Sequence, residues 1–280
     1  MNKNFVRIIP RLDIKNGNLI KGINLEGLRI LGDPYNFSKL YCELGADEIC
    51  YSDNVATLYG TNNLEKFISK TAKNLFIPLS VGGGIKSLKD VERMLKAGAD
   101  KVIINSAAID NIKFIKEASR VFGSSTIIAA IETINYNKKY YVLKSNGRDL
   151  TNRKILDWAT KLQDFGAGEL ILTSINKDGL KEGFDISITK KISKKLTIPV
   201  IAHGGCGKIG HVLDLIKKTN ISGVIIASYL HYYYFSKFKK KKFNLGNTSF
   251  YDQAKKQKKF DNLILNLKRE LKINNLNVRI

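Results

Sequence analysis

Short apolar, β-branched runs alternate with amphipathic segments along most of this chain. The amphipathic segments have helical spacing, as in Leu88–Ala97 and Asp157–Phe165. Nearly continuous apolar strands that alternate with helices indicate a parallel sheet covered by helices. Eight such units in about 230 residues predict a closed (β/α)8 TIM barrel, with an open doubly wound sheet as the alternative. The predicted strands are Val6–Asp13, Glu48–Asp53, Ile77–Gly82, Lys101–Asn105, Thr126–Glu132, Glu169–Ser174, Pro199–His203 and Gly223–Ser228.

The two halves of the chain resemble each other. Several pairs of segments align at offsets of 121 or 122 residues, which predicts a barrel built from two similar (β/α)4 halves. Such a barrel places symmetric sites at the mouth formed by the C-terminal ends of its strands. The aligned pairs are Glu43–Asp53 with Asp164–Ser174, Gly83-Gly84 with Gly204-Gly205, and Val102–Ser106 with Val224–Ser228.

Composition is that of a globular protein, with 44% hydrophobic and 26% charged residues among 280. We expect one domain over residues 1–280, with a Lys- and Tyr-rich insertion at about 232–260 before a last helix, Asn262–Leu271. No apolar run reaches about 18 residues, and the N-terminus lacks a signal-peptide pattern. Cys42, Cys50 and Cys206 show no CxxC spacing, so we expect free thiols in a cytoplasmic protein.

The net charge of +22 is the most unusual figure. Lysine supplies most of the excess and is spread along the whole chain, whereas dedicated nucleic-acid sites favour arginine and interleaved aromatic residues. We therefore expect neither a nucleic-acid nor a membrane partner. A non-catalytic scaffold that binds polyanions through Tyr232–Phe260, where nine lysines face one acid, is the alternative from a different class.

Glycine runs follow two symmetric strands. Gly82, Gly83 and Gly84 stand at the end of the third predicted strand, and Gly204 and Gly205 stand at the end of the seventh. Successive glycines let the backbone approach a ligand and direct N–H groups at an anion. The repeat therefore predicts two phosphate sites at the mouth. The residues at the ends of the fourth and eighth strands assist them: Asn105, Ser106, Ala227 and Ser228.

Two carboxyl groups end the symmetric first and fifth strands. Asp13 and Glu132 are 119 residues apart, and a carboxyl group from each half can act as a general acid and base pair between the phosphate sites. His203, His211 and His231 lack metal-ligand spacing, and no P-loop or dinucleotide fingerprint occurs. We expect no metal and no cofactor.

Several longer motifs resemble the cyclase subunit of imidazole glycerol phosphate synthase, the HisF family. The resemblance covers residues 5 to 231 and the last 20 residues. The sister isomerase of histidine synthesis shares the half-barrel plan, but it lacks the first loop that this chain has in common with the HisF family. It is therefore the weaker match. The motifs are Arg7–Asp13, Lys21-Gly22, Leu28-Arg29, Gly32–Pro34, Phe76–Ile85, Ala97–Val102, Phe122–Ser124, Gly166–Glu169, Leu172–Ser174 and Lys177–Gly179.

The resemblance implies a barrel that receives ammonia from a glutaminase (HisH-like) partner in a heterodimer. Ammonia then reacts at the mouth with a diphosphorylated substrate, phosphoribulosyl-formimino-AICAR-phosphate, to give imidazole glycerol phosphate and AICAR. It assigns substrate contacts to Lys21, Asp53, Thr173, Ser174, Asp178 and Gly179 in addition to the glycine sites. It also assigns an ammonia gate to Arg7, Glu48, Lys101 and Glu169, and a partner contact to Asp100.

One departure from the family concerns the catalytic pair, because Glu132 stands where the family has aspartate. The extra methylene moves the carboxyl group by roughly 1 Å, which can cost about 100-fold in rate. Three further departures lie near the mouth: Ser52–Ala56, His203 with Cys206, and the insertion. They also resemble second-copy HisF-like proteins that pass ammonia to a sugar amidotransferase in surface-polysaccharide synthesis. Cyclase and ammonia donor are therefore both kept as hypotheses.

Overall fold

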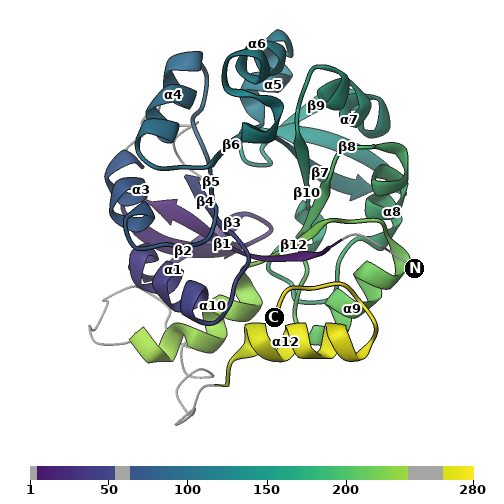
Figure 1. Ribbon diagram of the computed structural model, residues 1–280. Helices are drawn as coiled ribbons and strands as arrows, with labels where there is room; N and C mark the ends of the chain where they lie inside the picture. Colours follow the sequence, from purple (N-terminus) through teal and green to yellow (C-terminus); the bar gives the residue numbers. More distant parts are fainter. Residues whose placement is uncertain (1–4, 54–63, 239–260) are drawn as a thin grey trace.

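The computed structural model describes residues 5–53, 64–238 and 261–280. Within these residues, eight parallel strands close into a barrel with helices around its outside (Figure 1). Each strand pairs with the next in chain order, and pairing of the last strand with the first closes the sheet. The prediction of a TIM barrel and of its strands is confirmed. The barrel strands are β1 (Arg7–Lys15), β4 (Ile49–Asp53), β5 (Leu79–Gly82), β6 (Lys101–Ile104), β7 (Ile127–Tyr136), β10 (Glu169–Ser174), β11 (Val200–His203) and β12 (Gly223–Ile226).

Helices cover the outer face of the barrel with their apolar sides. The predicted helices at Leu88, Asp157 and Asn262 are all present, and Asn262 caps the last one by accepting a hydrogen bond from Leu265 N. The helices of the described residues are α1 (Pro34–Glu43), α3 (Glu65–Ala72), α4 (Leu88–Lys96), α5 (Ser106–Asp110), α6 (Lys113–Phe122), α7 (Ile155–Asp164), α8 (Ile186–Lys195), α9 (Ile209–Lys218), α10 (Ser228–Tyr234) and α12 (Leu263–Ile273). Short 3-10 turns are η1 (Ser124–Thr126), η2 (Ile175–Lys177) and η3 (Phe235–Phe238).

Two antiparallel extensions, which the strand pattern did not predict, rise from the barrel. β2 (Asn18–Ile23) and β3 (Glu26–Gly32) follow β1, while β8 (Lys139–Lys144) and β9 (Asp149–Lys154) follow β7. Because β1 and β7 are the first strands of the two halves, the internal repeat extends to these hairpins. Each hairpin continues a strand that carries one of the two predicted catalytic carboxyl groups, Asp13 and Glu132.

Apolar side chains form two main layers. One cluster consists of inward-facing residues of the barrel strands, including Ile9, Cys50 and Ile171. A much larger cluster fills the space between the strands and the helices. A third, small cluster joins Leu25 at the β2–β3 turn to Leu143 of β8 and Ile175 of η2. The hairpin of the first half therefore reaches across the mouth to the second half.

The predicted insertion lies mostly outside the described residues, which omit 239–260. Its first residues belong to the barrel, because Tyr232 and Tyr234 lie on α10 and the side chain of Tyr234 is buried. The Tyr234 hydroxyl donates to Asp261 O at 2.7 Å and so links α10 to the start of the last helix. In the described part of the chain, no helix is long and apolar enough to cross a membrane.

Candidate active site

A closed ring of alternating charges lies at the N-terminal end of the barrel. Arg7, Lys101 and Glu169 are the first residues of β1, β6 and β10, and Glu48 directly precedes β4. Arg7 contacts Glu48 at 2.7 Å and Glu169 at 2.8 Å, while Lys101 contacts the same two acids at 3.1 and 2.9 Å. The predicted gate residues thus come together from four strands.

Because the ring is largely buried, its charged groups are stable only while they pair with one another. The Glu48 side chain is only 1% exposed, and an isolated charge there would be costly. Burial opposes ionisation of Arg7, yet Glu169 and Glu48 raise its pKa above the ordinary value. The pKa of Glu169 is lowered, because Arg7 and Lys101 outweigh its burial. Asp100, next to the ring, is exposed and accepts a hydrogen bond from Leu79 N at 2.8 Å.

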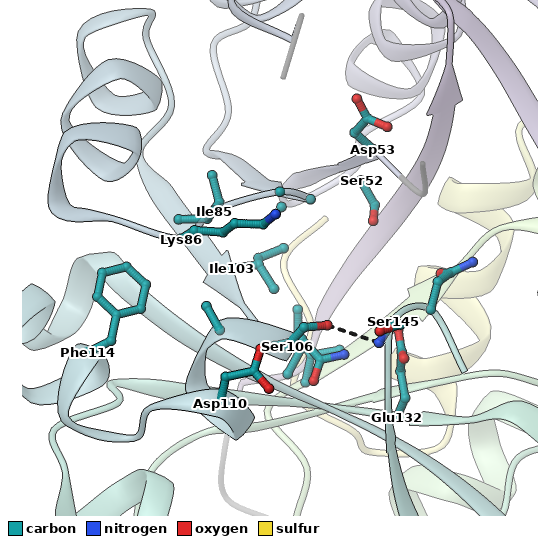
Figure 2. Close-up of a pocket in the computed structure, with 18 of the residues that line it drawn as sticks. Ser52, Asp53, Ile85, Lys86, Ile103, Ser106, Asp110, Phe114, Glu132 and Ser145 are labelled. Atoms are coloured by element: carbon teal, nitrogen blue, oxygen red, sulfur yellow. Dashed lines mark hydrogen bonds between the residues drawn. The ribbon is translucent and has the colours of Figure 1, made fainter. Parts of the chain in front are cut away.

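A cavity of about 700 Å³ opens at the C-terminal ends of the strands (Figure 2). Its lining includes residues that the sequence did not predict as site residues, among them Arg11, Lys86, Asp110 and Ser145. The β8–β9 turn helps to shape its wall, since Ser145 N donates to Ser106 Oγ at 3.0 Å. The predicted site residues that line it are Asp53, Gly82, Gly83, Gly84, Asn105, Ser106, Glu132 and Thr173.

The first glycine turn depends on the absence of a side chain at Gly83. Its φ is +105°, and a Cβ atom there would lie 2.3 Å from the carbonyl oxygen of Asp53. Only glycine therefore lets the chain after β5 pass this close to the end of β4. The turn forms part of the cavity wall beside Asn105, whose buried Oδ1 has no hydrogen-bond partner among the described residues. This half of the mouth is open to a ligand.

The second glycine turn is closed in this structure. Gly204, Gly205, Ala227 and Ser228 line a cavity of about 10 Å³, together with Asp178, Gly179 and His203. That is the space of about one water molecule. Gly205 has φ +111°, and a Cβ atom there would lie 2.1 Å from the carbonyl oxygen of Gly183. The second phosphate site stays a prediction, and a phosphate there requires the neighbouring segments to move.

A buried cluster of charges lies between the two turns. Arg11 Nε donates to Asp13 Oδ1 at 2.8 Å, and Lys21 Nζ lies 3.6 Å from Asp13 Oδ2. The same Lys21 ammonium binds Asp178 at 2.8 Å. His203 Nε2 lies 3.6 Å from Asp178 Oδ1, and its Nδ1 lies 3.1 Å from Thr173 Oγ1. Ser174, the neighbour of Thr173, is buried outside both cavities, and its hydroxyl oxygen has no partner among the described residues.

The two predicted catalytic carboxyl groups have opposite electrostatics. Burial alone would raise the pKa of Asp13, but the adjacent Arg11 and Lys21 cations lower it below the usual range. Burial raises the pKa of Glu132 to about 7, although Arg11 and the N–H of Gly147 oppose that rise. Burial, reinforced by Arg11 and Lys21, keeps the pKa of His203 well below its ordinary value, so this ring is neutral.

Arg11 is the most consequential site residue that the strand ends did not predict. It lies two positions before Asp13 on β1 and so shares the same inward face, a relation that the strand period of two could have revealed. Gly147, whose N–H donates to Glu132 Oε2 at 2.8 Å, lies in the β8–β9 turn and carried no such signal. Among the described residues, no cluster of His, Cys, Asp or Glu is arranged to hold a metal ion.

Proteins of histidine biosynthesis are similar to this chain over most of its length. A sequence model described as "Histidine biosynthesis protein" matches residues 7–236. A protein of Legionella pneumophila, "Imidazole glycerol phosphate synthase subunit HisF", is 49% identical over 205 residues, which cover 73% of this chain and 97% of that protein. Proteins of the same description from Bacillus cereus strains G9842 and Q1 are each 45% identical over 227 residues, 81% of this chain and 90% of each relative.

Proposed function

Because this chain belongs to the HisF family of histidine biosynthesis proteins, we propose that it is the cyclase subunit of an imidazole glycerol phosphate synthase. In this role it uses ammonia to convert phosphoribulosyl-formimino-AICAR-phosphate into imidazole glycerol phosphate and AICAR. The observation that carries the proposal is a cavity that exposes Glu132 at one end of the barrel and a ring of paired charges at the other end.

The ring supports a route for ammonia through the barrel. Arg7, Glu48, Lys101 and Glu169 close the N-terminal end with paired charges. Above them, inward-facing apolar side chains such as Ile9 and Ile171 line the interior up to the mouth. A small neutral molecule passes such a lining far more readily than an ammonium ion. The ring is therefore the gate that opens when a glutaminase partner binds.

The partner in this proposal is a glutaminase subunit of the HisH type, which docks at the N-terminal face to form a heterodimer. Asp100 is exposed beside the ring, which supports its assignment as a contact with the partner. We assign the complex to the cytoplasm, since Cys42, Cys50 and Cys206 are all free thiols, as is usual in a reducing compartment.

The substrate carries two phosphates, and the mouth offers them unequal sites. One phosphate binds at Gly82–Gly84 beside Asn105 and Ser106, where the cavity is open. The other binds at Gly204-Gly205 once this turn separates from Gly183. Substrate binding therefore requires local movement around the second turn.

A second candidate function is ammonia delivery to a sugar amidotransferase in surface-polysaccharide synthesis. Two observations favour it: the Arg11 guanidinium is bound to the first carboxyl group, Asp13, and the second glycine turn is closed. The gate would serve both functions equally.

A comparison of glutamine with free ammonia as the nitrogen source tests the proposed coupling between this chain and a glutaminase. The purified chain, combined with a HisH-type glutaminase, should use either glutamine or free ammonia to convert the phosphoribulosyl substrate. Lys101→Met should lower glutamine-dependent turnover at least 10-fold while ammonia-dependent turnover stays near wild type. Equal losses of turnover with both nitrogen sources would show that Lys101 is not part of an ammonia gate. Turnover with ammonia but not with glutamine would show that the glutaminase does not supply ammonia to this chain.

A further inference from the structure

The mouth of the barrel holds two separate cavities. The larger, of about 700 Å³, is lined from the ends of β5, β6 and β7, and the smaller, of about 10 Å³, from the ends of β11 and β12. The two share no lining residue in the part of the chain that the structure describes. Each holds a buried oxygen that lacks a hydrogen-bond partner among the described residues, Asn105 Oδ1 in the larger and Ser228 Oγ in the smaller. Both cavities therefore retain a polar group for a ligand.

A chain of four polar side chains runs between the two cavities. Arg11 Nη2 donates to Ser52 Oγ at 3.1 Å, and Arg11 Nη1 lies 3.4 Å from His203 Nδ1. Thr173 Oγ1 lies 3.1 Å from the same ring nitrogen. Ser52 lies on β4 and Thr173 on β10, which are four strands apart in either direction around the barrel. The four side chains therefore cross the mouth from one wall to the opposite wall.

The contact between Arg11 and His203 joins the two cavities, because Arg11 lines the larger and His203 lines the smaller. A guanidinium can only donate, so His203 Nδ1 accepts and the ring proton lies on Nε2, 3.6 Å from Asp178 Oδ1. Burial keeps the pKa of this ring well below its ordinary value, so the ring is neutral, as the acceptor role requires. Arg11 is also held by Asp13, whose Oδ1 accepts from Nε at 2.8 Å. The contact is thus anchored on both sides.

We infer that the contact between Arg11 and His203 is a latch that divides the mouth, and that the protein with its latch closed binds a ligand with one phosphate group in the larger cavity. The phosphate lies at the Gly82–Gly84 turn, and the Arg11 guanidinium faces the same cavity. A cavity of about 700 Å³ has the size of a site for a small molecule such as a mononucleotide. A ligand with two phosphates needs the smaller cavity as well, and binds there only after the latch opens.

This role rests on the proposed function and refines it. AICAR carries one phosphate and is compatible with the closed latch, whereas the diphosphorylated substrate must open it. Because only molecules with an open latch are competent to bind that substrate, its apparent affinity falls with their fraction. Ser52 and His203 also stand where this chain departs from the family pattern. Arg11 and His203 are therefore residues that determine specificity between ligands with one and two phosphates.

Titration calorimetry of the full chain with inorganic phosphate counts the accessible sites. We expect one phosphate per chain in the wild type and two in His203→Ala. Arg11→Lys breaks the latch from the other side, keeps a cation beside Asp13 and should also bind two. The double variant should bind both phosphates no more tightly than either single variant, because all three proteins lack the same contact.

Cys206→Ala is the matched control, because it enlarges the smaller cavity and leaves the side chains of Arg11 and His203 in place. It should bind one phosphate, as the wild type does. A second phosphate in Cys206→Ala would show that lack of space, and not the latch, closes the smaller cavity. Any count other than one in the wild type, or a single phosphate in both His203→Ala and Arg11→Lys, would overturn the inference.

Binding of the diphosphorylated substrate, measured in buffer without ammonia, gives a second readout. His203→Ala should bind it about 10-fold more tightly than the wild type does, whereas the affinity for AICAR should change much less. Equal substrate affinities in the two proteins would contradict the latch. The phosphate count needs no turnover. A wild-type chain that converted no substrate would therefore refute the proposed function, and the phosphate count would still judge the latch.

Discussion

Lys21 and Asp178 are 157 residues apart in sequence, and their Nζ and Oδ2 atoms lie 2.8 Å apart in the interior. Lys21 lies on β2 and Asp178 directly follows η2, so this pair joins the hairpin of the first half to the second half. A hydrogen bond from Asn24 N to Asp178 O at 2.9 Å and the contact of Leu25 with Ile175 reinforce the connection.

Removing the Lys21 ammonium should therefore destabilise the whole fold. Lys21→Met leaves the buried Asp178 and Asp13 carboxylates with fewer cations, and breaking a buried pair in this way costs about 3–5 kcal/mol. Urea unfolding measures the loss. The control is Lys218→Met, which breaks the exposed pair with Asp214 and should leave the midpoint unchanged. Equal midpoints for both variants would contradict the account.

The open glycine turn should bind an anion by itself. Gly83→Ala places a Cβ atom against the Asp53 carbonyl and strains a backbone with positive φ. We expect it to weaken binding of inorganic phosphate at least 10-fold, as measured by isothermal titration calorimetry. Gly210→Ala is the control, because its Cβ would meet only the end of Lys208. Unaltered phosphate affinity in Gly83→Ala would exclude this turn as the anion site.

Stability should also depend on pH through Glu132. Its pKa is about 7 when folded and near 4.5 in the unfolded chain, so its contribution is complete below about pH 4.5 and is lost as pH rises through 7. The difference between these two pKa values amounts to roughly 3 kcal/mol. Glu132→Gln should thus stabilise the protein more at pH 8 than at pH 5, as measured by urea unfolding at both values. A stability difference independent of pH would show that Glu132 is ionised throughout this range.

The ring at the base of the barrel predicts another loss of stability. Glu48→Gln keeps the shape of the side chain but leaves Arg7 and Lys101 sharing a single acid, Glu169. We expect a loss of about 3 kcal/mol in the free energy of unfolding. Glu43→Gln, in an exposed pair with Lys39, is the matched control and should not change the midpoint. A Glu48→Gln variant as stable as this control would mean that the ring is not a coupled unit.

The barrel strands could be predicted because they are short, apolar and buried on both faces. The hairpins were missed because polar positions interrupt them: β3 and β9 are mostly exposed or partly buried, and the largely buried β2 carries the charged Lys21. Their turns did carry a signal: Asn16 and Gly17 have φ of 48° and 75°, and Asn-Gly is a preferred pair in two-residue hairpin turns. The β8–β9 turn carries the same signal, because Asn146 and Gly147 have φ of 59° and 80°, but it is one residue longer and Ser145 also has a positive φ of 56°.

The site was predictable in its members but not in its electrostatics. Strand ends and the internal repeat pointed to Asp13 and Glu132, and both lie at the mouth. Their opposite pKa shifts depend on contacts from separate elements: Lys21 from β2 reaches Asp13, and Gly147 from the β8–β9 turn reaches Glu132. Such contacts follow from how the hairpins fold over the barrel, which local sequence patterns do not specify.

Ammonia-dependent conversion of phosphoribulosyl-formimino-AICAR-phosphate by the purified chain tests the central claim most directly. Substrate absorbance and the appearance of AICAR report the reaction. The account predicts turnover by the wild-type chain and its near loss in Glu132→Gln. A folded chain that binds the substrate and releases neither product would contradict the cyclase function and favour ammonia delivery to another acceptor.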